Sequence, residues 1–222
     1  MAINSLSTGF RPGVCTSSTR PTAPYEGQVI YETDTDLSYV WGGAAWQQVS
    51  GGTAVGNSGL VYVGGGALSG TTTNFVGCFT STYRDYRIVI DQVVGSAACA
   101  VYFRMLVGST PETAGGYYWS FLGYSSNGAT ANTSAGASTI GYTGISPSGG
   151  SANAHGVVEV GSPLLSARTT ILGSAAYLEP GLYTSRNGQC SVDTLSAYNG
   201  IQFLTNAATT FSGQVAIYGY RV

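Results

Sequence analysis

The sequence contains no lysine and little charge of either sign. Only 8% of its 222 residues are charged, against about 25% in an ordinary soluble domain, and eight arginines accompany ten acidic residues. A nucleic-acid-binding protein needs a cluster of basic side chains to neutralise phosphates, so this balance excludes that class. The longest apolar runs are far shorter than the roughly 20 residues of a transmembrane helix, so we expect no membrane insertion.

Helical periodicity and the composition of disordered chains are also missing. Aromatic residues make up 12% of the chain and the net charge is −2, whereas disordered chains have few aromatics and high charge. Many short runs alternate apolar and polar residues, as at Tyr86-Ile88-Ile90, and Gly, Ser and Asn separate them. We predict an all-β chain built around an antiparallel β-sandwich of jelly-roll type.

Neither a secretory leader nor a cysteine motif is present. The first residues carry no basic segment and no apolar segment, so we expect synthesis in a cytoplasm. A single histidine and the lack of any C-x-x-C pair argue against a zinc site. We expect free buried thiols, with two disulfides as the alternative, at Cys15, Cys78, Cys99 and Cys190.

Composition divides the chain into three parts. They are a strap and β-meander at residues 1–49, a Gly/Ser linker at 50–59, and a β-sandwich knob at 60–222. Pro21 and Pro24 favour extended backbone in the strap. Short strands bury little surface on their own, so we expect the first part to need a partner surface. Within the knob, Asn127–Ala137 is predicted to be an exposed loop and 189–196 a strand.

Few residues could support catalysis. His155 is the single histidine, and no Gly-x-Ser-x-Gly motif is present, so we interpret it as a strand-end surface residue rather than part of a triad. Asp85 is flanked by Arg84 and Arg87, which favours a structural ion pair over an acid catalyst. We predict no catalytic residue, no cofactor and no enzymatic activity.

Three acidic residues alternate in the first part of the chain. Glu32, Asp34 and Asp36 could share one side of an extended segment and bind Ca²⁺, but the glycine and bidentate glutamate of an EF-hand loop are missing. Asp side chains commonly form turns, so we favour a turn over a metal site.

The densest aromatic run spans residues 117–124. Alternation places Tyr117, Trp119 and Phe121 on one face and Tyr118, Leu122 and Tyr124 on the other. A sandwich strand needs only one apolar face, so a second aromatic face suits a subunit contact or a sugar. The predicted contact residues are Tyr117, Trp119 and Tyr124.

Residues 9–36, which include the run TRPTAPYEGQVIYETDTD at 19–36, resemble a segment that recurs in tailed-bacteriophage virion proteins. In minor tail proteins, tail fibres and head-surface proteins this segment precedes a short Trp-containing strand, as it precedes Trp41 and Trp46 here. The resemblance implies that this part docks the protein to the virion. The docking residues that it implies are Phe10, Arg11, Pro12, Arg20, Pro21, Pro24, Tyr25, Tyr31, Trp41 and Trp46.

Residues 79–90, 167–174, 201–205 and 213–220 more loosely resemble a β-sandwich domain of phage surface proteins, which ends in Y-G-Y or a similar sequence. The resemblance implies a virion surface protein, usually trimeric, made in the host cytoplasm. The partners it implies are other copies of the chain and other virion proteins, with a host surface glycan as a further candidate.

Three functions remain open at this point. The leading one is a non-enzymatic structural protein, a short trimeric tail fibre or knob for host attachment. The second is a head decoration or cement protein with a mechanical role. The third is a glycan-degrading tail spike, against which the scarcity of acidic residues argues.

Overall fold

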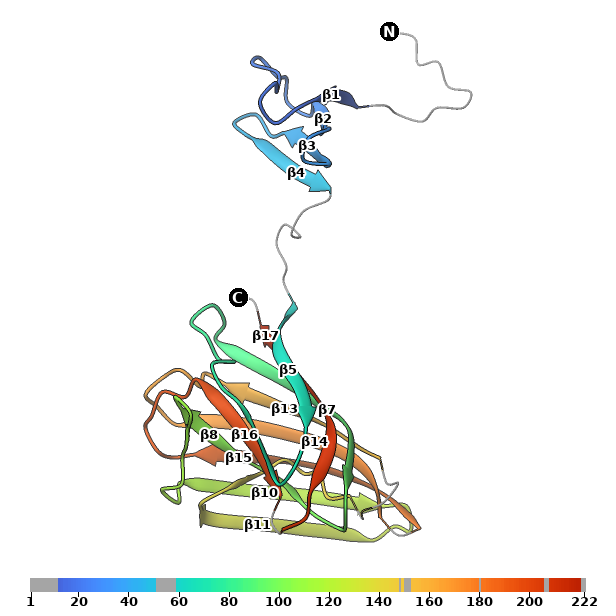
Figure 1. Ribbon diagram of the computed structural model, residues 1–222, viewed down its shortest axis with the longest axis vertical. Coiled ribbons are helices and arrows are strands. Elements are labelled where there is room, and N and C mark those ends of the chain that lie inside the picture. The colour runs from blue at the N-terminus through green and yellow to red at the C-terminus, as the bar shows by residue number, and fades with distance from the viewer. Residues whose placement is uncertain are drawn as a thin grey trace. The chain divides into compact units, whose positions relative to one another are not determined.

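Figure 1 shows the computed structural model, which describes residues 12–50, 59–147, 149, 153–179, 181–205 and 208–220. The chain divides into two compact units, Met1–Asn57 and Ser58–Val222. The described residues form strands and turns without any helix, so the predicted all-β class is confirmed. Most of the predicted linker, residues 51–58, lies outside the described residues.

The N-terminal unit is a single four-stranded sheet in the order β1-β2-β3-β4. Its strands are β1 (Gly13–Cys15), β2 (Val29–Glu32), β3 (Leu37–Trp41) and β4 (Trp46–Ser50). Because β1 is parallel to β2, the chain must cross over between them, and the proline-containing segment 16–28 is that crossover. The predicted strap therefore folds back within its own unit. The other strands form the predicted meander, with positive-φ Asp36 and Gly43 in its turns.

The larger unit is a sandwich of two antiparallel sheets. The eight-stranded sheet has the order β11-β10-β15-β14-β13-β7-β17-β5, and the five-stranded sheet has the order β12-β8-β16-β6 with β9 paired to β8. The wide sheet consists of β5 (Leu60–Leu68), β7 (Asp85–Gly95), β10 (Tyr117–Ser125), β11 (Thr130–Ser138), β13 (Ala154–Gly161), β14 (Thr169–Glu179), β15 (Leu182–Val192) and β17 (Phe211–Tyr220). The narrow sheet consists of β6 (Thr72–Phe75), β8 (Val101–Val107), β9 (Thr110–Pro111), β12 (Gly141–Tyr142) and β16 (Gly200–Thr205).

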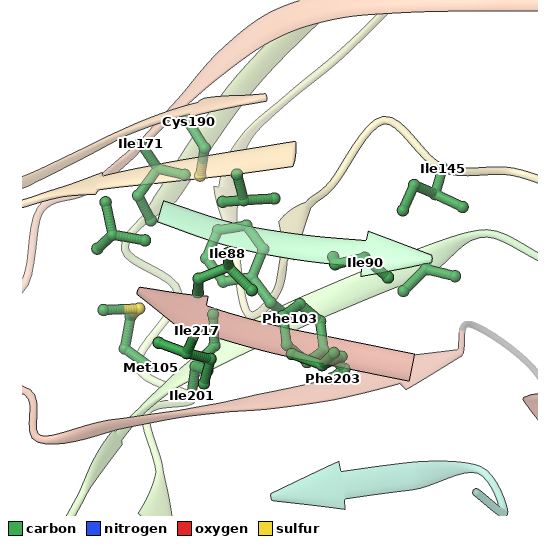
Figure 2. Packing of buried hydrophobic residues seen from close by; sticks show 14 of the residues in the cluster. Ile88, Ile90, Phe103, Met105, Ile145, Ile171, Cys190, Ile201, Phe203 and Ile217 are labelled. Atoms are coloured by element: carbon green, nitrogen blue, oxygen red, sulfur yellow. The ribbon is translucent and has the colours of Figure 1, made fainter. Parts of the chain in front are cut away.

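The core lies between the two sheets. Figure 2 shows Ile88 and Ile90 of β7 and Ile217 of β17 close to Phe103 of β8 and Phe203 of β16, and all five are fully buried. Burial of each such side chain contributes roughly 1.5–3 kcal/mol to folding. The alternation predicted for β7 is confirmed, since its even-numbered residues from 86 to 90 are buried and the intervening ones are partly exposed.

One predicted loop is a strand. The stretch 127–137 was expected to be a loop, but most of it belongs to β11, which pairs with β10 at the edge of the wide sheet. Its side chains are small and mostly exposed on both faces, so the sequence shows no alternation that would mark a strand. The strand predicted at 189–196 also starts earlier, at Leu182, because positive-φ Gly181 turns β14 directly into β15.

Candidate functional site

Arg20 ties the crossover of the N-terminal unit to β2 and β3. Its Nε donates to a carboxylate oxygen of Glu32, whose other oxygen accepts a hydrogen bond from Thr35 Oγ1 at 2.8 Å. The guanidinium also lies over the Tyr39 ring, 4.3 Å from its centroid. Glu32 has no exposed surface, and the hydrogen bond from Arg20 lowers the pKa of its carboxyl. Arg20 is therefore engaged within the fold of this unit.

Asp34 and Asp36 are engaged in the same way. Asp34 accepts hydrogen bonds from Ser17, with the backbone nitrogen at 2.9 Å and 3.1 Å from its two carboxylate oxygens and Oγ at 2.6 Å. The hydroxyl bond from Ser17 lowers the pKa of the Asp34 carboxyl. Asp36 accepts from the hydroxyl of Tyr31 and takes the positive φ of the turn that was predicted there. Among the described residues, no group of three or more His, Cys, Asp and Glu side chains is arranged to hold a metal ion.

The N-terminal unit leaves apolar and aromatic surface exposed. Among its described residues, Ile30 is the one fully buried apolar side chain. Val14, Tyr25 and Val49 are 54%, 71% and 57% exposed. A sheet with so small a core has apolar surface available for contact with another molecule.

The predicted docking residues differ in accessibility. Trp41 and Trp46 lie side by side on β3 and β4, with ring centroids 5.5 Å apart and edge-to-face geometry, and both are partly exposed. Tyr25 is the most exposed of the set that the structure describes, whereas Arg20 is partly buried. Partly buried members are Pro12, Pro21, Pro24 and Tyr31. Phe10 and Arg11 lie outside the described residues.

The aromatic strand β10 follows the predicted alternation, which requires one correction to the predicted contact residues. Tyr117 is fully buried, its hydroxyl accepts a hydrogen bond from Met105 N at 2.9 Å, and burial raises its pKa. It is a core residue and has no surface for a receptor or subunit. Trp119 is partly buried and packs against the core. Tyr124, at 51% exposed, lies on the outer face with Tyr118.

Further exposed or partly exposed aromatic residues lie elsewhere on the outer face of the wide sheet. Tyr62 of β5 and Tyr218 of β17 are paired across the strands, with ring centroids 5.7 Å apart. The chain offers no local signal for this pair, because the two residues come from opposite ends of the sandwich sequence and only strand pairing joins them. Tyr183, in β15, is 75% exposed.

The charged residues of the outer face are paired with one another. Arg84 Nε lies 3.0 Å from Asp85 Oδ2, so the ion pair predicted for Asp85 is confirmed. Arg87 Nη1 lies 3.2 Å from Glu159 Oε1, and the hydroxyl of Tyr220 donates to Glu159 Oε2 at 2.8 Å. Partial burial raises the pKa of Tyr220. This polar group was not predicted, because Glu159 and Tyr220 meet only through the pairing of β13, β7 and β17.

His155 also lies on this face and is exposed, as predicted. Its Nδ1 is 3.2 Å from Asp91 Oδ1, and the two side chains are 55% and 53% exposed. The pair joins β13 to β7 at the surface, where solvent weakens its electrostatic interaction.

Two hollows adjoin on the outer face of the wide sheet. One, of about 630 Å³, is lined by Arg84, Asp85, Tyr86, Glu159, Val160, Gly161, Thr170, Leu172 and Tyr220. The other, of about 350 Å³, is lined by Tyr118, Trp119, Ser120, Ala135, Arg168, Thr170, Gln189, Cys190 and Ser191. Thr170 lines both, so the two hollows meet there. Of the lining residues, the sequence had pointed to Trp119 as a contact residue and, by alternation, to Tyr118 on the outer face, but the strand pairing that joins them to the other hollow was not predicted.

All four cysteines are free thiols, as predicted. Cys78, Cys99 and Cys190 are buried, whereas Cys15 in the N-terminal unit is only partly buried. Burial raises the pKa of Cys78 and of Cys190 to about 12, which disfavours the reactive thiolate. The three buried thiols therefore behave as small apolar side chains of the core.

The described residues include no helix that is long and apolar enough to span a membrane. The chain matches no protein-family model, no curated protein and no solved structure.

Proposed function

We propose that this chain is a non-enzymatic structural protein of a bacteriophage virion, docked by residues 1–49 and exposing the β-sandwich of residues 60–222 for attachment to a host surface. The proposal includes a homotrimeric assembly on the virion surface. It rests on the resemblance of residues 9–36 to virion-protein segments. The function is supported physically by the accessible surface of the N-terminal unit.

The observation that carries the docking role is the exposed apolar surface of this small unit. Arg20 of the crossover pairs with Glu32 of β2, and Ser17 of the crossover donates to Asp34 in the turn after β2. These two contacts attach the crossover to the sheet. Tyr25 in the crossover and Val49 on β4 remain exposed. The backbone at Tyr25 is held by a hydrogen bond from Gln28 N to Tyr25 O at 3.0 Å. A contact residue whose backbone is ordered before binding loses less conformational entropy when it binds.

Incorporation into particles tests the docking role. A chain lacking residues 1–49 is expected to keep a folded sandwich but to be absent from purified particles. A finer variant is Tyr25→Ser, and its matched control is Tyr183→Ser, since the two tyrosines are 71% and 75% exposed but belong to different units. We expect the first substitution to lower incorporation and the second to leave it unchanged. Normal incorporation of the truncated chain would refute the docking role.

Copy number then separates tail from head. A few copies at one vertex of labelled particles would place the protein on the tail, as proposed. Many copies distributed over the head would instead indicate a decoration protein, and would refute host attachment as the main role.

A further inference from the structure

The two hollows of the outer face form one trough that runs across the strands. Its floor follows a row of residues paired in register, in which Ser191 of β15 is opposite Thr170 of β14, and Thr170 is opposite Gly161 of β13. The row continues to Tyr118 of β10 on one side and to Asp85 of β7 on the other. The residues of the middle strands in this row, Ser191, Thr170 and Gly161, have small side chains or none, so little side-chain volume projects into the trough between its two ends.

Aromatic side chains stand at both ends of this trough. Tyr118, 44% exposed, lines one end, and the partly exposed Tyr220 of β17 lines the other. Five strand spacings separate β10 from β17 in the sheet, which corresponds to about 24 Å at about 4.8 Å per spacing. The shape suits an extended ligand lying perpendicular to the strands rather than a compact one.

The charges that line the trough cancel. Its walls carry the arginines Arg84 and Arg168 and the carboxylates Asp85 and Glu159. All four are held in ion pairs within the chain, Arg168 with its Nε 2.7 Å from Asp193 Oδ1. An ionised ligand would therefore find no net counter-charge, so the electrostatics favour a neutral one.

The same groups keep hydrogen-bonding capacity toward a ligand. A carboxylate accepts about four hydrogen bonds and a guanidinium donates five. Glu159 interacts with one group at each oxygen, Arg87 and the hydroxyl of Tyr220, and so keeps acceptor sites on both. Asp85 accepts from Ser162 N at 3.0 Å and Ser162 Oγ at 3.3 Å on Oδ1 and from Arg84 on Oδ2, which leaves one acceptor site on Oδ2. Polar groups in fixed positions beside exposed aromatic rings are the features that recognise a polyhydroxylated ligand with apolar ring faces.

We propose that this trough binds a neutral, linear glycan that lies across β10, β15, β14, β13, β7 and β17. The assignment deepens the proposed function, on which it rests, because it names the surface and the ligand class of host attachment. In this arrangement sugar rings stack on Tyr118 and Tyr220, while their hydroxyls exchange hydrogen bonds with Asp85, Glu159 and the adjacent arginines.

An oligosaccharide array tests the assignment with the purified full chain. The probes are neutral oligosaccharides of hexoses and N-acetylhexosamines, with sialylated and uronic-acid oligosaccharides alongside. The blocking variant is Thr170→Tyr, which places a ring in the middle of the trough. Its matched control is Ser174→Tyr, on the same strand and the same exposed face but outside the trough.

We expect the full chain to bind neutral oligosaccharides, the longer ones more tightly, and Thr170→Tyr to weaken that binding at least about tenfold while Ser174→Tyr does not. Tyr118→Ala, an exposed substitution, is expected to weaken binding as well, and thermal melting shows whether each variant is folded. No binding to any neutral probe, or equal loss in Thr170→Tyr and Ser174→Tyr, overturns the proposal. Binding to acidic probes alone also overturns it.

A subunit interface is the competing use of this face. If Thr170→Tyr changes the sedimentation of the chain while no glycan binds, the trough is covered by another copy and the glycan assignment fails. Docking is tested separately, by incorporation of chains changed within residues 1–49 into particles. A chain that binds no glycan can therefore still be incorporated, and a chain that is not incorporated can still bind glycan, so the two proposals fail independently.

Discussion

Phe121 occupies a space that exists because three neighbouring positions are glycine. The ring is fully buried and lies 5.1 Å from the Tyr142 ring, centroid to centroid. A Cβ at Gly173 would come within 2.9 Å of Phe121 Cζ, and a Cβ at Gly144 would come within 3.0 Å of Phe121 Cε1. A Cβ at Gly188 would lie 2.2 Å from the backbone oxygen of Ser120, as well as 2.5 Å from Phe121 Cγ. At Gly144 and Gly173 the closest clash is therefore with the ring, although a Cβ at Gly173 would also lie 3.1 Å from the backbone oxygen of Thr143, whereas at Gly188 the closest clash is with backbone.

Substitution of Phe121 by Ala is expected to lower the free energy of unfolding of the sandwich by about 3–5 kcal/mol, the usual range for a buried Phe. For a unit of this size that corresponds to a fall in melting temperature of roughly 6–20 °C. Gly173→Ala alone overpacks the site and is expected to cost about 1–3 kcal/mol. In the Phe121→Ala background the new methyl group enters the vacated space. The loss of unfolding free energy in the double variant is therefore expected to be smaller than the sum of the two single-variant losses, by at least about 1 kcal/mol.

Gly188→Ala is the matched control for this cycle. Its clash with Ser120 O persists when the ring is removed, so we expect the Phe121→Ala background to relieve much less of its cost. Calorimetry of the full chain, read at the transition of the sandwich, measures the unsubstituted protein, the three single variants and the two double variants. If Gly173→Ala and Phe121→Ala were additive within about 0.5 kcal/mol, the glycine would not be required by the ring and the reasoning would be refuted.

Two further predictions concern ionisable groups. Because their carboxyl pKa values are lowered, Glu32 and Asp34 stabilise the N-terminal unit fully above their usual pKa values of 4.5 and 3.8, and this stabilisation is lost as the pH falls through the lower folded values. Amide NMR should show this unit unfolding in acid, with a weaker pH dependence in Glu32→Gln; equal dependence in the two chains would contradict the argument. In native protein at pH 8, iodoacetamide should modify Cys15 before Cys78 or Cys190, because those two are buried with pKa values of about 12. Equal modification rates by mass spectrometry would rule this out.

Strand alternation could be predicted wherever a strand has one apolar face. The faces of β7 and β10 follow directly from the sequence, because burial on one side selects Ile or aromatic residues at every second position. At β11 this signal is absent. An edge strand that is exposed on both faces, built from Thr, Ala, Ser and Gly, carries the composition of a loop, and only its pairing with β10 makes it a strand.

The candidate site could be predicted only in part, because strand pairing rather than local sequence brings most of its residues together. Tyr118 lies in a local aromatic run and is visible from alternation. Glu159, Tyr220 and Thr170 come from three strands that no sequence pattern connects, and the order β14-β13-β7-β17 places them together. The turn of the N-terminal unit could be predicted because Asp34 and Asp36 lie within it, directly after Glu32 at the end of β2, but the pairing of Glu32 with Arg20 could not.

The scarcity of charge acquires a structural meaning from these contacts. Every arginine that the structure describes donates to a partner within the chain: Arg20 to Glu32, Arg84 to Asp85, Arg87 to Glu159, Arg168 to Asp193, Arg104 to the carbonyl oxygen of Thr139 and Arg186 to the hydroxyl of Tyr142. Arginine suits this use because its planar fork of donors is fixed in geometry, whereas a lysine would offer a mobile point charge. The outer face of the sandwich therefore presents oriented hydrogen-bonding groups and tyrosine rings with almost no net charge. A ligand bound there as we propose would be recognised by its hydroxyl groups and ring faces, and its binding should depend little on salt.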